Sequence, residues 1–139
     1  MTTHPGPARL LTAFLVAVVV AVVWGSVVQT QYNLAALSAI GTDIPTGVWA
    51  ASTARDVFSG FSPTYAGYIV LPSLLVAFLV AWWVARRAPG GPLPWFTLAG
   101  VVAIGVGIPL VNWLSPLALL IGASRDVSAT VLMAVGGAV

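Results

Sequence analysis

Four polar side chains fall on one face of the first long apolar segment: Ser26, Gln29, Thr30 and Asn33. Their spacing of three and four residues places them on the same side of an α-helix. Lipid cannot satisfy an amide or a hydroxyl, so we expect this face to point into a helix bundle or a hydrated cavity. Asn112, in a later apolar segment, is predicted at the same membrane depth, within reach of Gln29 or Asn33.

This polar face predicts either hydrogen bonds between helices or a pocket for a substrate or an ion. Hydrogen bonds between membrane helices contribute about 0.6 kcal/mol each, and we favour that structural role. No acidic side chain lies in the middle of an apolar segment. A proton-coupled multidrug antiporter needs such a carboxylate, so this class of protein is disfavoured.

The residue combinations of an enzyme are missing from the sequence. We find no nucleophile–base pair, cluster of metal ligands or phosphate-binding loop, and expect no catalytic residue, cofactor or metal site. The chain has no cysteine, which excludes disulfides, thiol redox chemistry and iron–sulfur clusters. Its one histidine, His4, lies outside the apolar segments, which excludes haem held by two histidines within the bilayer.

Two Arg-Asp dipeptides, Arg55-Asp56 and Arg125-Asp126, lie in links that we predict on the outer side of a membrane. Neighbouring residues on a helix do not face each other. Each arginine could therefore pair with the aspartate of the other dipeptide and tie the two links together. The alternative, which we prefer, is that each arginine extends independently to the lipid headgroups.

The composition points to a membrane protein. The 139 residues are 60% hydrophobic and 6% charged, whereas a soluble globular protein carries about 25% charged residues. Mean hydropathy is +1.05. The net charge of +2 rests on five arginines and three aspartates, which is too few charges to indicate a nucleic-acid partner.

We predict a single all-α membrane domain, an integral bundle of four transmembrane segments. About 20 residues cross the hydrocarbon core, and the apolar runs predict spans at about 10–32, 63–85, 95–114 and 127–139. The intervening links are 41–60, 86–94 and 116–126. Within 41–60, we expect either a short interfacial helix anchored by Trp49 or an irregular loop. Pro72 should distort the second span and free a carbonyl near Tyr68.

The two terminal segments each leave an alternative. The first could be a cleaved signal peptide, but its apolar run exceeds the roughly 7 to 15 residues of such peptides, so we expect a membrane anchor. The last predicted segment, 127–139, has only 13 residues. It must either begin upstream, or be partly buried or truncated.

The arginines predict the orientation. Arg9 precedes the first segment, and Arg86 and Arg87 form the link between the second and third. Unbalanced positive charge stays in the cytoplasm, so both termini and the turn at 86–94 should be cytoplasmic.

Small residues recur at four-residue intervals in three of the segments. Such ladders let helix backbones approach closely, and close packing is the main force that joins helices in lipid. We expect packing within the bundle, and the alternative is a face for another protein. The ladder residues are Ala13, Ala17, Ala21, Gly25, Ser73, Ala77, Ala81, Ala99, Ala103 and Gly107.

Residues 24–37 read WGSVVQTQYNLAAL, and Arg55-Asp56 is followed by GFSPTY at 60–65. These stretches resemble a group of small, uncharacterised, four-helix proteins of the bacterial inner membrane, whose fourth segment ends in a longer tail than this sequence has. The resemblance implies a bacterial inner-membrane location and transfers no activity.

These observations favour a non-catalytic accessory or scaffold subunit of a larger membrane complex. The alternative is a small homo-oligomeric transporter or lipid-handling protein that uses the outer polar pocket formed by Ser26, Gln29, Thr30, Asn33 and Asn112. The expected partners are membrane lipids and either other membrane subunits or further copies of this chain.

Overall fold

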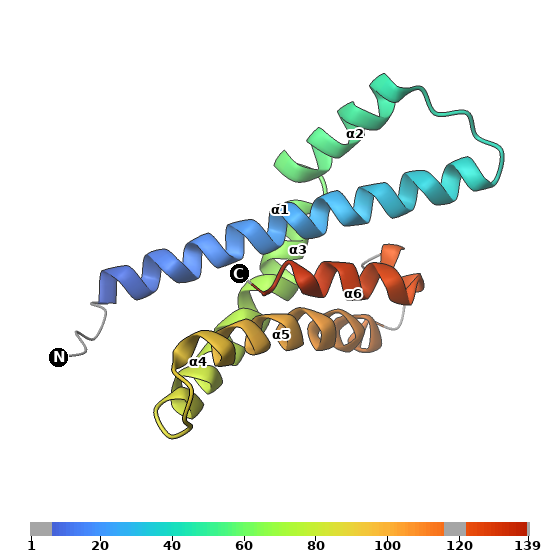
Figure 1. Cartoon of the computed structure of the whole chain (residues 1–139). Helices are drawn as coiled ribbons and strands as arrows, with labels where there is room; N and C mark the ends of the chain where they lie inside the picture. The colour runs from blue at the N-terminus through green and yellow to red at the C-terminus, as the bar shows by residue number, and fades with distance from the viewer. Residues whose placement is uncertain (1–6, 116–121, 139) are drawn as a thin grey trace.

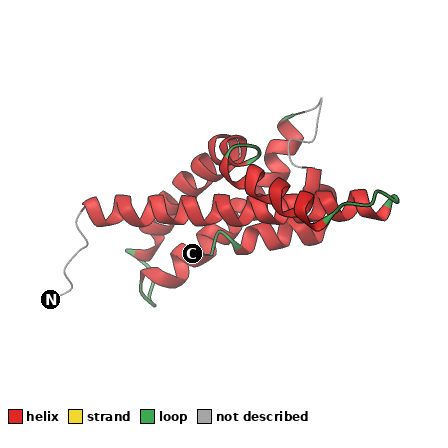
Figure 2. Ribbon diagram, turned by 90° about the horizontal axis from the view of Figure 1, so that it is seen from above, coloured by secondary structure: helices red, strands yellow, loops and turns green. Residues whose placement is uncertain are grey.

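The computed structural model describes residues 7–115 and 122–138, and this part of the chain is helical without a strand (Figures 1 and 2). All-α architecture is therefore confirmed for the described residues. The elements, in order, are α1 (Pro7–Ala39), α2 (Thr46–Phe58), α3 (Ser62–Tyr65), the π-helical turn η1 (Ala66–Val70), α4 (Leu71–Ala85), α5 (Pro92–Leu114), the 3₁₀ turn η2 (Gly122–Arg125) and α6 (Val127–Val135).

The first helix, α1, is longer than a membrane requires. Its 33 residues extend over about 50 Å at 1.5 Å per residue, whereas the hydrocarbon core is about 30 Å thick. The predicted span at 10–32 lies within it. The C-terminal third of α1 continues as helix and serves as the support for α2 (Figure 1).

The link after α1 contains a helix, so of the two alternatives for 41–60 the structure has the helical one. α2 runs back along the C-terminal half of α1 (Figure 1). The Trp49 indole N–H donates to Gln31 Oε1 at 2.6 Å, and Gln31 Nε2 donates to Thr53 Oγ1 at 3.1 Å. The polar end of Trp49 is thus bound to α1.

The second apolar segment is a continuous run of α3, η1 and α4. Pro63 stands in the first turn of α3, where its missing N–H costs nothing. The distortion expected at Pro72 is present. The π-helical turn η1 lies immediately before the first turn of α4, which contains Pro72. Because Pro72 has no N–H, the helix cannot form the regular bond to the Tyr68 carbonyl, and it widens by one π turn.

α4 and α5 form a hairpin (Figure 1). Gly90 and Gly91, with φ of +103° and +77°, make the turn between them, since glycine adopts positive φ without strain. The small-residue ladders of the two helices meet at Gly107, where an added Cβ would lie 2.5 Å from the Ser73 hydroxyl. The two backbones therefore approach each other closely at this point.

The other ladder positions differ in burial. Ala17, Ala21, Ala81 and Ala103 are buried, and Gly25 is packed beneath the Tyr65 ring, which an added Cβ would strike. Partial exposure is found at Ser73, Ala77 and Ala99, and Ala13 is exposed.

Within residues 7–115 and 122–138, three stretches are long and apolar enough to cross a membrane: Ala8–Ala39, Thr46–Ala85, which includes α2 to α4, and Pro92–Leu114. α6 has nine residues, or about 14 Å, and a fourth span at 127–139 remains a prediction. α6 runs antiparallel to α1, held by Trp24 Nε1, which donates to the Leu132 carbonyl at 2.6 Å.

The start of α1 and the turn between α4 and α5 lie at the same end of the molecule (Figure 1). At that turn Arg86 and Arg87 stack on Trp82 and Trp83, at 3.7 Å and 4.2 Å from the ring centres.

Candidate functional site

The polar face of α1 is buried over three of its four residues. Ser26, Gln29 and Thr30 are each at most 5% exposed, and Asn33 is exposed. The first two bind other elements directly: the Ser26 and Ser62 hydroxyls are 2.7 Å apart, and Gln29 Oε1 accepts from the Ala123 N–H at 3.0 Å. The face therefore points into the bundle.

Thr30 links α1 to α2. Its hydroxyl donates to Asp56 Oδ2 at 2.7 Å, and the Ser26 carbonyl is also within reach at 2.9 Å. This bond brings a charged residue of the first Arg-Asp dipeptide onto the polar face.

The sequence allowed a direct bond between Asn112 and Gln29 or Asn33, but none is formed in the described part of the chain. Asn112 Nδ2 donates to Ser124 Oγ at 2.6 Å, and Gln29 binds the backbone of the neighbouring Ala123. The two amides instead hold the same turn, η2: Gln29 from α1 and Asn112 from α5. Asn112 Oδ1 is buried and has no hydrogen-bond partner among the described residues.

The crossed pairing considered for the two Arg-Asp dipeptides does not occur among the described residues. Asp56 accepts from Thr30, and Asp126 accepts from the N–H and hydroxyl of Ser128 at 2.8 Å and 2.7 Å. The Ser128 contacts cap α6 and lower the pKa of Asp126, because they stabilise its charged form. The Ser128 hydroxyl is also 2.6 Å from the Tyr32 hydroxyl of α1.

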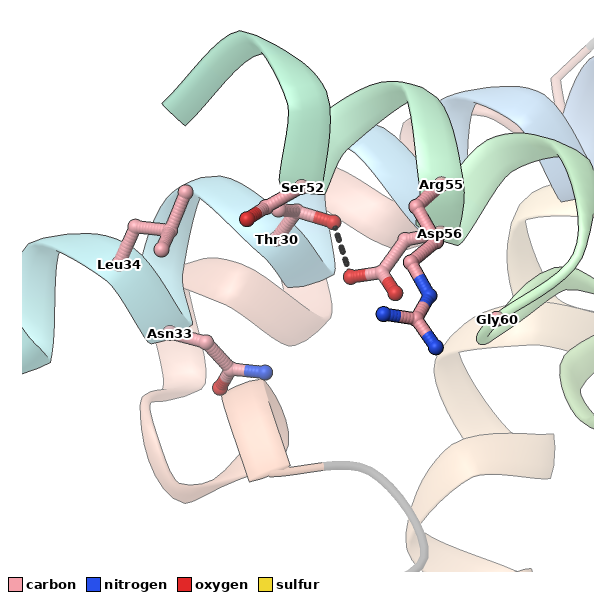
Figure 3. A pocket seen from close by; sticks show the side chains of 7 residues that line it. All are labelled: Thr30, Asn33, Leu34, Ser52, Arg55, Asp56 and Gly60. Atoms are coloured by element: carbon pink, nitrogen blue, oxygen red, sulfur yellow. Dashed lines mark hydrogen bonds between the residues drawn. The ribbon is translucent and has the colours of Figure 1, made fainter. Parts of the chain in front are cut away.

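A pocket of about 460 Å³ opens between α1 and α2 beside the Thr30–Asp56 bond (Figure 3). Figure 3 shows Asn33 facing it from α1, and the Arg55 guanidinium beneath the Asp56 carboxylate in this view. Its lining residues are Thr30, Asn33, Leu34, Ser52, Arg55, Asp56 and Gly60. Two residues of the predicted polar pocket, Thr30 and Asn33, are therefore in the lining, whereas Ser26, Gln29 and Asn112 hold neighbouring elements.

The end of α2 shapes one wall of this pocket. The N–H groups of Ser59 and Gly60 both bond to the Arg55 carbonyl, at 2.9 Å and 2.8 Å, and turn the chain sharply toward α3. A Cβ at Gly60 would lie 2.5 Å from Asp56 Oδ1. Glycine at this position therefore leaves room for the Asp56 carboxylate.

Several polar groups in the pocket have no partner in the described part of the chain. They are the Arg55 guanidinium, Asp56 Oδ1, the Ser52 hydroxyl and the Asn33 amide. Together they can accept and donate hydrogen bonds and can meet either sign of charge. This arrangement is suited to binding a polar group.

Sequence reasoning singled out Arg55 and Asp56 but missed Ser52, Leu34 and Gly60. Ser52 stands three and four residues before the dipeptide, so helical spacing would have placed it on the same side of α2. That signal depended on 46–58 being a helix, which the sequence left open.

Comparisons with protein-family models, with curated proteins and with solved structures find no match to this chain. The bacterial inner-membrane location and the subunit role therefore rest on the sequence alone.

Proposed function

We propose that the chain is a non-catalytic integral membrane protein that binds the polar headgroup of a lipid in the pocket between α1 and α2. The observation that carries this proposal is the set of unpartnered charged and polar groups in that pocket, where Arg55 and Asp56 are both accessible. Charged groups of this kind bind ligands through strong hydrogen bonds.

The position of the pocket supports a lipid as the ligand. It lies level with Thr30, four residues beyond the Ser26–Ser62 contact at which the second apolar segment begins. On α2, Val48 and Phe58 are 52% and 84% exposed. Exposed apolar groups beside a polar pocket are typical of a helix lying at a membrane surface. By the arginine distribution, this is the outer surface.

Four spans, both termini in the cytoplasm and a bacterial inner membrane belong to the same proposal. The fourth span would be formed by α6 and the residues beside it, seated against α1 and α5. The accessory-subunit role is the competing proposal. Purification in a mild detergent separates the two, because a stoichiometric larger partner would favour the accessory role.

The proposal is tested by measuring bound lipid. The protein, purified from membranes and washed in detergent, should retain about one lipid per chain by native mass spectrometry. Arg55→Gln should lose this lipid, because the guanidinium is exposed and makes no other described side-chain contact. Arg125→Gln is the matched control, an exposed arginine of the other dipeptide that lies outside the pocket.

Equal lipid retention by the two variants would contradict the proposal, as would a wild-type protein without bound lipid. Both variants keep a hydrophilic side chain on the surface, so a difference in folding between them is not expected.

A further inference from the structure

The pocket holds two opposite charges that form no ion pair with each other in the described structure. Arg55 and Asp56 are adjacent in sequence, yet in the described structure the guanidinium makes no ion pair, and Asp56 uses one oxygen for Thr30. The second oxygen, Oδ1, lies beside Gly60, and both residues line the pocket. The pocket therefore offers one cation and one anion, with a net charge of zero.

These charges discriminate among headgroups. A headgroup with only a negative charge would bind Arg55 but would be repelled by Asp56. A headgroup with only a positive charge would bind Asp56 but would be repelled by Arg55. A zwitterion satisfies both charges. Repulsion of headgroups that carry only one sign of charge supplies the selectivity.

The type of cation follows from the chemistry of the lining. Asp56 Oδ1, the Ser52 hydroxyl and the Asn33 carbonyl are acceptors, and a primary ammonium carries three N–H donors to match. A quaternary ammonium has no N–H group and is held by aromatic faces. No aromatic residue lines this pocket in the described chain.

The anion is best met by Arg55, because a planar guanidinium donates two parallel hydrogen bonds to a phosphate or carboxylate. The Asn33 amide can add a further donor from α1.

We infer that the pocket binds a zwitterion in which a primary ammonium is joined by a short linker to a phosphate or carboxylate, the ammonium at Asp56 and the anion at Arg55. This inference rests on the proposed function, and it specifies the headgroup. Phosphatidylethanolamine is the lipid with this chemistry, and glycerophosphoethanolamine carries the same group as a free solute.

The test uses the full chain in nanodiscs that contain equal amounts of phosphatidylethanolamine, phosphatidylglycerol and phosphatidylcholine. After extraction into detergent, retained lipids are counted by native mass spectrometry. We expect phosphatidylethanolamine to be enriched about tenfold over each of the others, as the loss of one charge-assisted hydrogen bond would predict. Arg125→Gln should keep this enrichment.

Asp56→Asn is the decisive variant. It keeps an oxygen for Thr30 but removes the negative charge, so it should abolish the preference for phosphatidylethanolamine over phosphatidylglycerol while lipid is still retained. Thermal stability, measured in parallel, shows whether the variant is folded. If it is not, Ser52→Ala, which removes only an acceptor, should reduce the enrichment in a folded protein.

The outcomes separate the two proposals. Lipid retention that depends on Arg55 but shows no headgroup preference would overturn the zwitterion and leave lipid binding standing. Binding of glycerophosphoethanolamine to lipid-free protein, with no lipid retained from nanodiscs, would support the zwitterion and overturn a lipid as its source. Absence of both would overturn both.

Discussion

The α1–α2 end and the α4–α5 hairpin are held together by different means. At the α1–α2 end, side-chain hydrogen bonds cross from one element to another, as in Thr30–Asp56 and Gln29–Ala123. In the hairpin, Gly107 lies directly against Ser73. Close packing suffices where two helices run side by side in lipid, whereas a site that must receive a polar ligand needs side chains whose positions are set by directional bonds.

The two ends should also lie on opposite sides of the membrane, and labelling is the largest effect that we predict. The chain has no native cysteine, so a single introduced thiol is unambiguous. Ser52→Cys on α2 should be labelled by an impermeant reagent outside intact cells. Pro89→Cys, exposed in the hairpin turn, should be labelled only after lysis. The reverse result would invert the topology and place the pocket in the cytoplasm.

Disrupting the hairpin should cost the most stability. Gly107→Leu forces a large side chain against Ser73 and Ile69, and we expect a loss of about 3 kcal/mol, seen as a lower melting temperature in detergent. Val106→Leu is the matched control, because Val106 is 58% exposed. Similar melting temperatures for the two variants would mean that the small-residue ladder is not closely packed.

Removing one directional bond at the other end should have a smaller and more local effect. Gln29→Leu leaves the Ala123 N–H without its acceptor, which costs about 1–3 kcal/mol for a buried donor. Hydrogen exchange should become faster across η2. Gln31→Leu, on the same helix, should instead loosen α2, since Gln31 binds Trp49 and Thr53. If both changes affected the same element, the polar contacts would not be specific.

The smallest effect concerns the cap of α6. The folded-state pKa of Asp126 lies below its ordinary value of 3.8, so its contribution to stability is complete above that value and is lost as pH falls through the lowered folded-state pKa. Fraying of α6 by hydrogen exchange should therefore increase only in strong acid. Asp126→Asn keeps a capping oxygen and should remove this pH dependence; an unchanged profile would assign the dependence to another group.

Local patterns were enough to predict much of this molecule. The spacing of Ser26, Gln29, Thr30 and Asn33 predicted a single inward face, and the first three are buried whereas Asn33 is exposed. Pro72 predicted the distortion realised as η1. Both depend on residues within a few helical turns of each other, where the 3.6-residue period and the missing proline N–H act directly.

The parts that escaped prediction depend on distant contacts. The helix at 46–58 is bonded to Gln31 and Thr30 of α1, which are distant in sequence. The hydrogen-bond partner of Gln29 lies 94 positions away, in η2. The sequence placed Gln29 and Asn112 at the same membrane depth, but in the structure each of them binds η2. Contacts of this kind are determined by tertiary packing, and they produce no periodic pattern in the sequence.

The unbroken length of α1 has a mechanical consequence. One stiff rod carries Thr30 in the pocket wall and Arg9 near its other end, about 30 Å away at 1.5 Å per residue. If the rod pivots near Arg9 by roughly 5°, Thr30 moves by between about 2 and 3 Å, and α2 moves with it because it is bonded to the same part of α1. Any force that tilts this lever thus shifts α2 and the pocket together relative to the α4–α5 hairpin.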